Sequence, residues 1–142
     1  MEDILNASLA GGVVIGTVCT MLQYSAVALA LGLIIGFIST VGFWKIGPLL
    51  AEKGFADVCG IHNLHAVPGL LGGFISAIVL ASYKGTSTVV GATTANVDFT
   101  HQASMQVAGT FISLGIGLAS GYVCGWIISF FKNPPDYLFF ED

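Results

Sequence analysis

The stretch DVCGIHNLHAVPGLLGG, residues 57–73, places one aspartate and two histidines in an otherwise apolar, glycine-rich run. Titratable groups are costly in apolar surroundings unless they are paired. If the segment is helical, Asp57, Ile61 and His65 are successive i, i+4 neighbours along one broad face. Eight helical residues rise about 12 Å, so His65 is expected well inside an apolar layer whose edge lies near Asp57.

Long runs without charge surround this stretch. Residues 4–44, 58–83 and 99–131 contain no Asp, Glu, Lys or Arg, and only 8% of the chain is charged. A soluble domain carries roughly 25% charged residues, and a membrane-spanning helix needs about 20 mostly apolar ones. The sequence therefore predicts an all-α, polytopic transmembrane helix bundle with four spans. Gln23-Tyr24 separates the first two, and the expected spans are 4–22, 25–46, 61–82 and 103–131.

The four lysines set an orientation for these spans. Lys45 and Lys53 lie between the second and third spans and Lys132 follows the fourth, whereas Lys84 lies on the opposite side. The positive-inside rule then places both termini, including a tail at 132–142, in the cytoplasm. The net charge of −4 and the lack of arginine leave no basic patch, which excludes nucleic-acid binding.

Nineteen glycines recur at four-residue spacing. Small residues four apart share one helix face and let two backbones approach closely. This pattern predicts tight packing between spans. The repeated positions are Gly12 and Gly16, Gly32 and Gly36, Gly69 and Gly73, and Gly117, Gly121 and Gly125.

Pro68 predicts a local distortion beside His65. Proline lacks an amide hydrogen and clashes with the carbonyl four residues earlier, here that of Leu64. A carbonyl without a helical partner is tolerated at membrane depth where it lines a cavity or finds another donor. Asp57 is also a candidate N-cap that accepts from the amides of Cys59 or Gly60, and this role is compatible with one in a pathway.

Three interpretations of His65 stay open from the residues alone. It can be a structural group bonded to a neighbouring helix, a metal ligand with His62, or a pore residue. The metal interpretation is weak because the acidic residues lie elsewhere, and no metal or cofactor is predicted. An ionisable group inside a membrane is by default a functional candidate. A buried neutral imidazole donates one hydrogen bond and accepts one, which suits a small polar solute.

The family resemblance rests on four motifs. NASLAGGVVIGT (6–17), GFISTVGF (36–43), DVCGIHNLHAVPGLLGG (57–73) and PPDYLFFED (134–142) resemble, in order, the C-terminal part of Rh glycoproteins. These proteins form a branch of the ammonium transporter/Rh superfamily. The resemblance covers essentially the whole chain, and the N-L-H-x-x-P-G ending of the third motif favours the Rh branch over the bacterial and plant forms.

The resemblance implies a fold of about eleven spans in two inverted repeats, assembled as a homotrimer in the plasma membrane. Each subunit of the family has a narrow apolar pore with two facing histidines, one from each repeat. His65 resembles the histidine of the second repeat, Ile61 and Leu64 fall beside the pathway, and Asp57 resembles the acidic residue at the start of this helix. His62 and Asn63 are secondary candidates.

The implied activity is transport of ammonium or ammonia across the lipid bilayer, with carbon dioxide as a proposed second substrate. Ammonium loses a proton before it crosses, because a bare charge in hydrocarbon is costly. The alternative is a non-conducting four-helix membrane protein with an assembly or regulatory role. Enzyme function is not expected, since no nucleophile–base pair or phosphate loop is present.

Two departures from the family pattern qualify the resemblance. Ala66 stands where the family usually has glycine after the pore histidine. The match also begins near the eighth span of the family fold, so we expect a fragment or truncated form that lacks the first repeat. A pore needs walls from both repeats.

Overall fold

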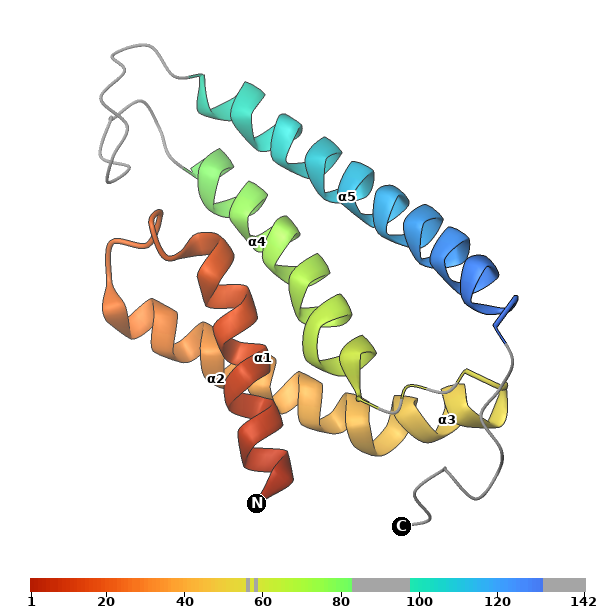
Figure 1. The fold of residues 1–142 in the computed structure, drawn as a ribbon. Coiled ribbons are helices and arrows are strands. Elements are labelled where there is room, and N and C mark those ends of the chain that lie inside the picture. Colours follow the sequence, from red (N-terminus) through yellow and green to blue (C-terminus); the bar gives the residue numbers. More distant parts are fainter. Residues whose placement is uncertain (56, 58, 83–97, 132–142) are drawn as a thin grey trace. The chain divides into compact units, whose positions relative to one another are not determined.

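The computed structural model of the chain describes residues 1–55, 57, 59–82 and 98–131. Every regular element in these residues is helical, which confirms the predicted all-α class. The predicted tail, 132–142, and residues 83–97 between the last two predicted spans lie outside the described residues. The elements in chain order are α1 (Glu2–Val18), α2 (Ser25–Val41), η1 (Gly42–Ile46), α3 (Gly47–Glu52), η2 (His62–Ala66), α4 (Val67–Ser82) and α5 (Phe99–Ile128) (Figure 1).

Three helical segments are long and apolar enough to cross a membrane. They are Ser25–Glu52 with 28 residues, His62–Ser82 with 21 and Phe99–Ile128 with 30. They correspond to the second, third and fourth predicted spans. Helix α1, at 17 residues, is shorter. At 1.5 Å per residue it reaches about 26 Å, slightly less than the hydrocarbon core, so its crossing stays a prediction.

Among the predicted boundaries that differ from the structure are two helix ends and one helix start. The first helix ends at Val18 rather than at 22, because the amides of Met21 and Leu22 converge on the Val18 carbonyl in a turn. The last helix ends at Ile128 rather than at 131, because the Phe131 amide bonds three residues back, to the Ile128 carbonyl.

The third correction is the start of the last helix, which begins at Phe99 rather than at 103. The Asp98 carboxylate accepts hydrogen bonds from the amides of Thr100 and His101, at 3.0 and 3.2 Å. This is the arrangement of an N-cap, which satisfies amides that have no partner within the helix. A single charged residue therefore sets the helix start earlier than the hydrophobic pattern indicated.

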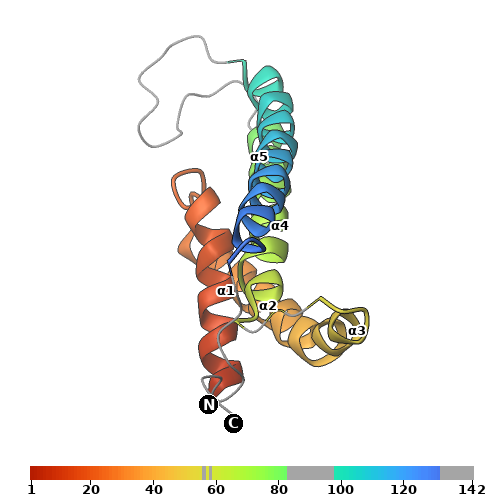
Figure 2. The same ribbon diagram turned by 45° about the vertical axis from the view of Figure 1, so that its right-hand side comes forward.

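The second predicted span, 25–46, continues as a helix through η1 and α3 to Glu52 (Figure 2). Pro48 does not stop it: the turn before it is π-helical, with the Gly47 amide bonding the Gly42 carbonyl, and the helix resumes as α3. The Lys45 ammonium lies 4.4 Å from the centre of the Trp44 ring. Trp and Lys are typical of the membrane–water interface, so this pair favours a membrane boundary near the predicted end of the span.

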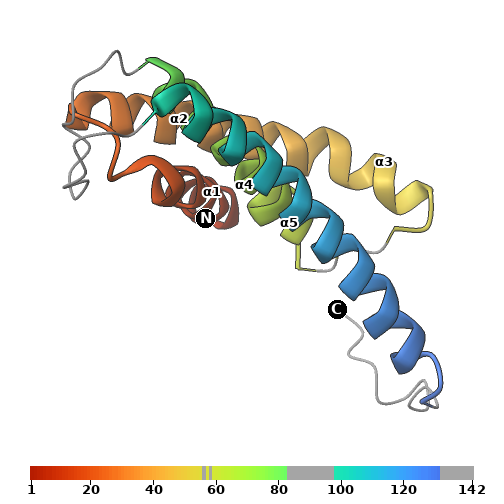
Figure 3. The ribbon, with the colours of Figure 1, turned by 90° about the horizontal axis from the view of Figure 1, so that it is seen from above.

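The chain divides into two compact units, Met1–Thr110 and Phe111–Asp142. In the first unit α1 packs against both α2 and α4, and α1 and α2 lie side by side in the views of Figures 1 and 3. Ala10, Val14 and Val18 on α1 are fully buried. A second apolar cluster joins Leu80 to the start of α5. These contacts fix α4, which carries the histidine segment.

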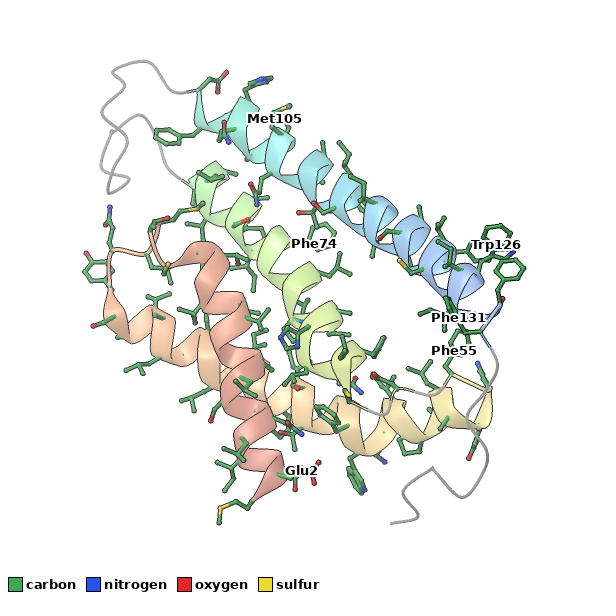
Figure 4. All side chains as sticks on the ribbon, viewed as in Figure 1. Glu2, Phe55, Phe74, Met105, Trp126 and Phe131 are labelled. Carbon is green, nitrogen blue, oxygen red and sulfur yellow. The ribbon has the colours of Figure 1, made fainter. Side chains whose placement is uncertain are left out.

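The second unit contains the C-terminal half of α5. Near its end the Trp126 ring, labelled in Figure 4, meets Phe130 edge to face with centroids 4.9 Å apart. Aromatic side chains concentrate where a span leaves the hydrocarbon. Their position agrees with a span that ends near Ile128.

Glycines bring the backbones of α1 and α2 together. A Cβ added at Gly11 would lie 2.8 Å from the Gly32 carbonyl oxygen, and one at Gly36 would lie 2.9 Å from the Ala7 carbonyl oxygen. The predicted close approach through Gly32 and Gly36 is therefore confirmed. On α1 the contact is made by Gly11, not by the predicted pair Gly12 and Gly16, where an added Cβ would meet no other described part of the chain within 4 Å.

Gly36→Ala is expected to destabilise the α1–α2 pair. Helix propensity favours alanine by about 1 kcal/mol, but forcing a methyl group against a backbone oxygen costs about 1–3 kcal/mol. Gly12→Ala is the matched control, because its Cβ enters open space. Thermal aggregation in detergent is the measurement. Equal midpoints for the two variants would contradict the observed packing.

Candidate functional site

Asp57 caps the start of the histidine segment from outside the helix. Its Oδ1 accepts from the Ile61 amide and its Oδ2 from the His62 amide, both at 2.9 Å. The predicted capping role is thus confirmed, but the predicted donors, Cys59 and Gly60, are wrong. Asp57 is also not on the helix, so the assumed helical face through Asp57, Ile61 and His65 does not exist. The loop before the helix brings the carboxylate to its first amides.

Gly60 makes this loop possible. Its φ is +64°, in the left-handed region that favours glycine. A Cβ at this position would also fall against the Phe43 ring. The turn is closed by the Gly60 amide, which donates to the Asp57 carbonyl at 3.0 Å. Backbone freedom at one residue therefore lets the Asp57 carboxylate fold back over the helix start.

The predicted distortion beside His65 is confirmed as a π-helical turn, His62–Ala66. The Val67 amide bonds the His62 carbonyl, five residues back instead of four. The Leu64 carbonyl was expected to lose its helical partner. In the structure the Asn63 carbonyl, one residue earlier, accepts from a side chain instead. The donor is the hydroxyl of Ser39 on α2, whose Oγ lies 2.9 Å from the Asn63 oxygen.

Asn63 is the buried anchor of the π turn. Only 2% of it is exposed, and its Oδ1 lies 3.3 Å from Nδ1 of His62. An amide oxygen only accepts, so this bond requires the proton on Nδ1 of His62. His62 is half-buried. Its ring is therefore engaged within the fold and less available to a solute.

His65 has the opposite environment. It is exposed, as are Ala66 after it and Ile61 before the turn, with Ile61 57% exposed. Leu64 is half-buried and Pro68 is buried. The π turn thus has one side buried within the first unit and another, its uncovered side, where the exposed residues Ile61, His65 and Ala66 lie. The imidazole of His65 is on the uncovered side.

A polar cavity of about 440 Å³ lies beside the Asp57 cap. Glu2 on the first turn of α1 and Phe55 after α3, both labelled in Figure 4, contribute to its wall. Asp57, Cys59 and Asn63 complete its polar lining together with Asn6. The cap is therefore next to space large enough for water.

The predicted packing glycines divide into two groups. Gly73 lies against the side chain of Thr110, and its neighbour Gly72 would place a Cβ 2.6 Å from Thr17 Oγ1 on α1. A Cβ added at Gly69 would meet no other described part of the chain within 4 Å, and the same holds for Gly117, Gly121 and Gly125 in the second unit. Packing through Gly117, Gly121 and Gly125 stays a prediction.

Four residues of the site have roles that were not predicted from the sequence. They are Ser39, Gly42, Phe43 and Gly60, and they meet η2 or its preceding loop. A signal for Ser39 was present, since a hydroxyl inside an apolar span usually bonds something specific. No periodicity marks the other three, because their role depends on one loop conformation and one close approach.

The fold and site define an all-helical membrane-embedded protein with an imidazole on the uncovered side of a distorted span. Residues 1–133 match the model of the Ammonium Transporter Family, and the chain belongs to this family. The expected resemblance is thereby confirmed. No solved structure matches the chain.

Curated relatives carry the name of ammonium transporter. The chain is 37% identical to ammonium transporter Rh type B of Takifugu rubripes and 38% identical to ammonium transporter Rh type C of Xenopus laevis, with 100% of this chain and 33% of each relative covered. Identity to ammonium transporter Rh type C of Homo sapiens is 36%, over 100% of this chain and 32% of the relative. The chain spans about a third of the length of these relatives.

Proposed function

We propose that this chain forms part of a pathway for ammonium or ammonia across a membrane, with His65 in that pathway. Membership of the Ammonium Transporter Family and the names of its relatives support the substrate. Ile61 and Leu64 line the pathway near His65, and Asp57 holds the start of the helix that carries it. The protein acts as a transporter rather than as an enzyme.

The exposed imidazole of His65 carries this proposal. It projects from an apolar 21-residue helical segment on a side that described residues leave uncovered. A polar ring facing lipid is unfavourable, so such residues face a bundle interior or a pathway. The buried residues beside it, Asn63 in the turn and Pro68 in α4, are used for packing. His65 has no such structural use in the described fold.

Three further features of the proposal rest on the resemblance to Rh glycoproteins. The complete protein is a homotrimer in the plasma membrane, in contact with lipid, and carbon dioxide is its second substrate. The exposed apolar side chains of α2 support contact with lipid or with further protein. Leu29, Leu33 and Phe37 recur every four residues on this helix and are 70, 75 and 71% exposed.

A chimera tests the transport proposal. Residues 1–131 of this chain replace the matching third of ammonium transporter Rh type C of Xenopus laevis, and uptake of labelled methylammonium is measured in oocytes. We expect uptake well above that of uninjected cells. Surface expression without uptake, while the unmodified relative transports, would contradict the proposal and favour the non-conducting role.

The proposed orientation places both termini in the cytoplasm. Single cysteines report it in a background where the three native cysteines are serine. We expect Thr100→Cys to react with a membrane-impermeant maleimide on intact cells, and Lys53→Cys to react only after permeabilisation, because Lys53 is on the lysine-rich side. Both residues are exposed, so access is not limited by packing. If Lys53→Cys reacted on intact cells and Thr100→Cys only after permeabilisation, the proposed orientation would be the wrong way round.

A further inference from the structure

We propose that Ser39 and Asn63 are positioning residues that set the direction of the His65 side chain by holding the π turn. This inference rests on the proposed place of His65 in the pathway. Ser39 is 2% exposed and so is Asn63, although both lie in strongly apolar segments. Buried polar groups of this kind are retained when their hydrogen bonds determine a specific geometry.

The hydrogen-bond ladder explains why Ser39 is needed. In the π turn the Val67 amide bonds the carbonyl five residues back, that of His62. The next rung would join the amide of residue 68 to the Asn63 carbonyl, but residue 68 is proline and has no amide hydrogen. The Ser39 hydroxyl donates to this carbonyl at 2.9 Å. It replaces the one bond that Pro68 removes.

The same construction occurs at the facing π turn. In η1 the Gly47 amide bonds the Gly42 carbonyl, and residue 48 is again proline. Asn63 fits between the two turns: a Cβ added at Gly42 would lie 2.5 Å from its Oδ1, and one at Gly47 would lie 3.8 Å from its Nδ2. The two proline-ended π turns are therefore docked, with the Asn63 side chain as the wedge.

This docking bears directly on His65. A π turn holds one residue more per turn than an α-helix, and one residue corresponds to a rotation of about 100° in an α-helix. If the turn relaxed to regular α-helix, His65 would rotate by about that angle relative to α4. Ser39 and Asn63 oppose this relaxation from a neighbouring helix. They act on the imidazole through the backbone of the π turn.

Hydrogen exchange of the Val67 amide, in the 142-residue chain in lipid nanodiscs, tests the structural step. We expect Ser39→Ala to accelerate this exchange about five- to tenfold, the effect of losing one buried hydrogen bond. Ser39→Thr keeps the hydroxyl and should restore protection. Thr40→Ala is the matched control, because the Thr40 hydroxyl bonds only the Gly36 carbonyl of its own helix.

A second background makes the test specific. Pro68→Ala supplies the missing amide, so Ser39→Ala should then change Val67 exchange less than about twofold, since coupled residues give non-additive effects. Equal acceleration in both backgrounds, or no acceleration in either, would overturn the proposal. These readings do not depend on transport, so they separate this inference from the proposed function.

Uptake by the chimera tests the functional step. We expect Ser39→Ala to lower methylammonium uptake and to shift its pH profile, with recovery in Ser39→Thr and no change in Thr40→Ala. An unaltered uptake and pH profile in Ser39→Ala, despite accelerated Val67 exchange, would overturn the positioning role. Failure of the unsubstituted chimera to transport would instead count against the proposed function alone.

Discussion

Replacement of His65 by alanine is expected to reduce methylammonium uptake by the chimera by about tenfold or more, the effect of removing a hydrogen-bonding partner from a solute that has lost its water. The imidazole is on the uncovered side of the π turn, where it is free to meet a solute. Alanine offers no donor or acceptor there. Uptake is measured at equal surface expression.

Two variants separate this role from general damage. His65→Glu retains a titratable hydrogen-bonding group and should keep part of the uptake with altered selectivity between ammonium and other cations. His62→Ala should have a much smaller effect, because the His62 ring is half-buried and bonded to Asn63. Normal uptake by His65→Ala, together with loss of uptake in His62→Ala, would show that the pathway histidine has been assigned wrongly.

The spans could be predicted from the sequence because burial in lipid leaves a composition that is easy to recognise. Charge-free runs gave the helical class and the break at Gln23-Tyr24, where the structure has the turn between α1 and α2. The helix ends were less accurate. Ends depend on single hydrogen bonds, such as the one that the Thr100 amide donates to the Asp98 carboxylate, and hydropathy carries no information about them.

The histidine segment shows where pattern-based inference stops. Pro68 predicted a distortion, and Asp57 a cap, from local chemistry that needs no tertiary information. The form of the distortion could not be predicted, because a π turn depends on Ser39, a residue of another helix. The capping amides were missed for a related reason. They depend on the left-handed conformation of Gly60, which moves Asp57 off the helix axis.

Glycine spacing illustrates the same limit. A four-residue repeat indicates that some face is small, but not which face meets a neighbour. On α1 the repeated pair is Gly12 and Gly16, whereas the backbone contact is made by Gly11. One residue corresponds to about 100° of rotation, so a shift of one position changes the contacting face entirely.

Gly60→Ala is expected to give the largest loss of stability among single methyl additions to the described residues. An L-residue in the left-handed region costs about 1–2 kcal/mol, and the added Cβ also meets the Phe43 ring. Overpacking adds about 1–3 kcal/mol to this strain. The free energy of unfolding, measured by SDS titration in mixed micelles with circular dichroism, should therefore fall by about 2–5 kcal/mol relative to the unsubstituted chain.

Gly54→Ala separates the two causes. Its φ of +84° imposes a similar backbone strain, but no described heavy atom lies within 4 Å of the added Cβ. It should cost only the strain, about 1–2 kcal/mol. In a Phe43→Ala background the ring is gone, so Gly60→Ala should then cost no more than Gly54→Ala. Equal losses of stability for Gly60→Ala with and without the Phe43 ring would mean that contact with this ring is not the reason for glycine at position 60. Backbone conformation alone would then hold the Asp57 carboxylate over the amides of Ile61 and His62.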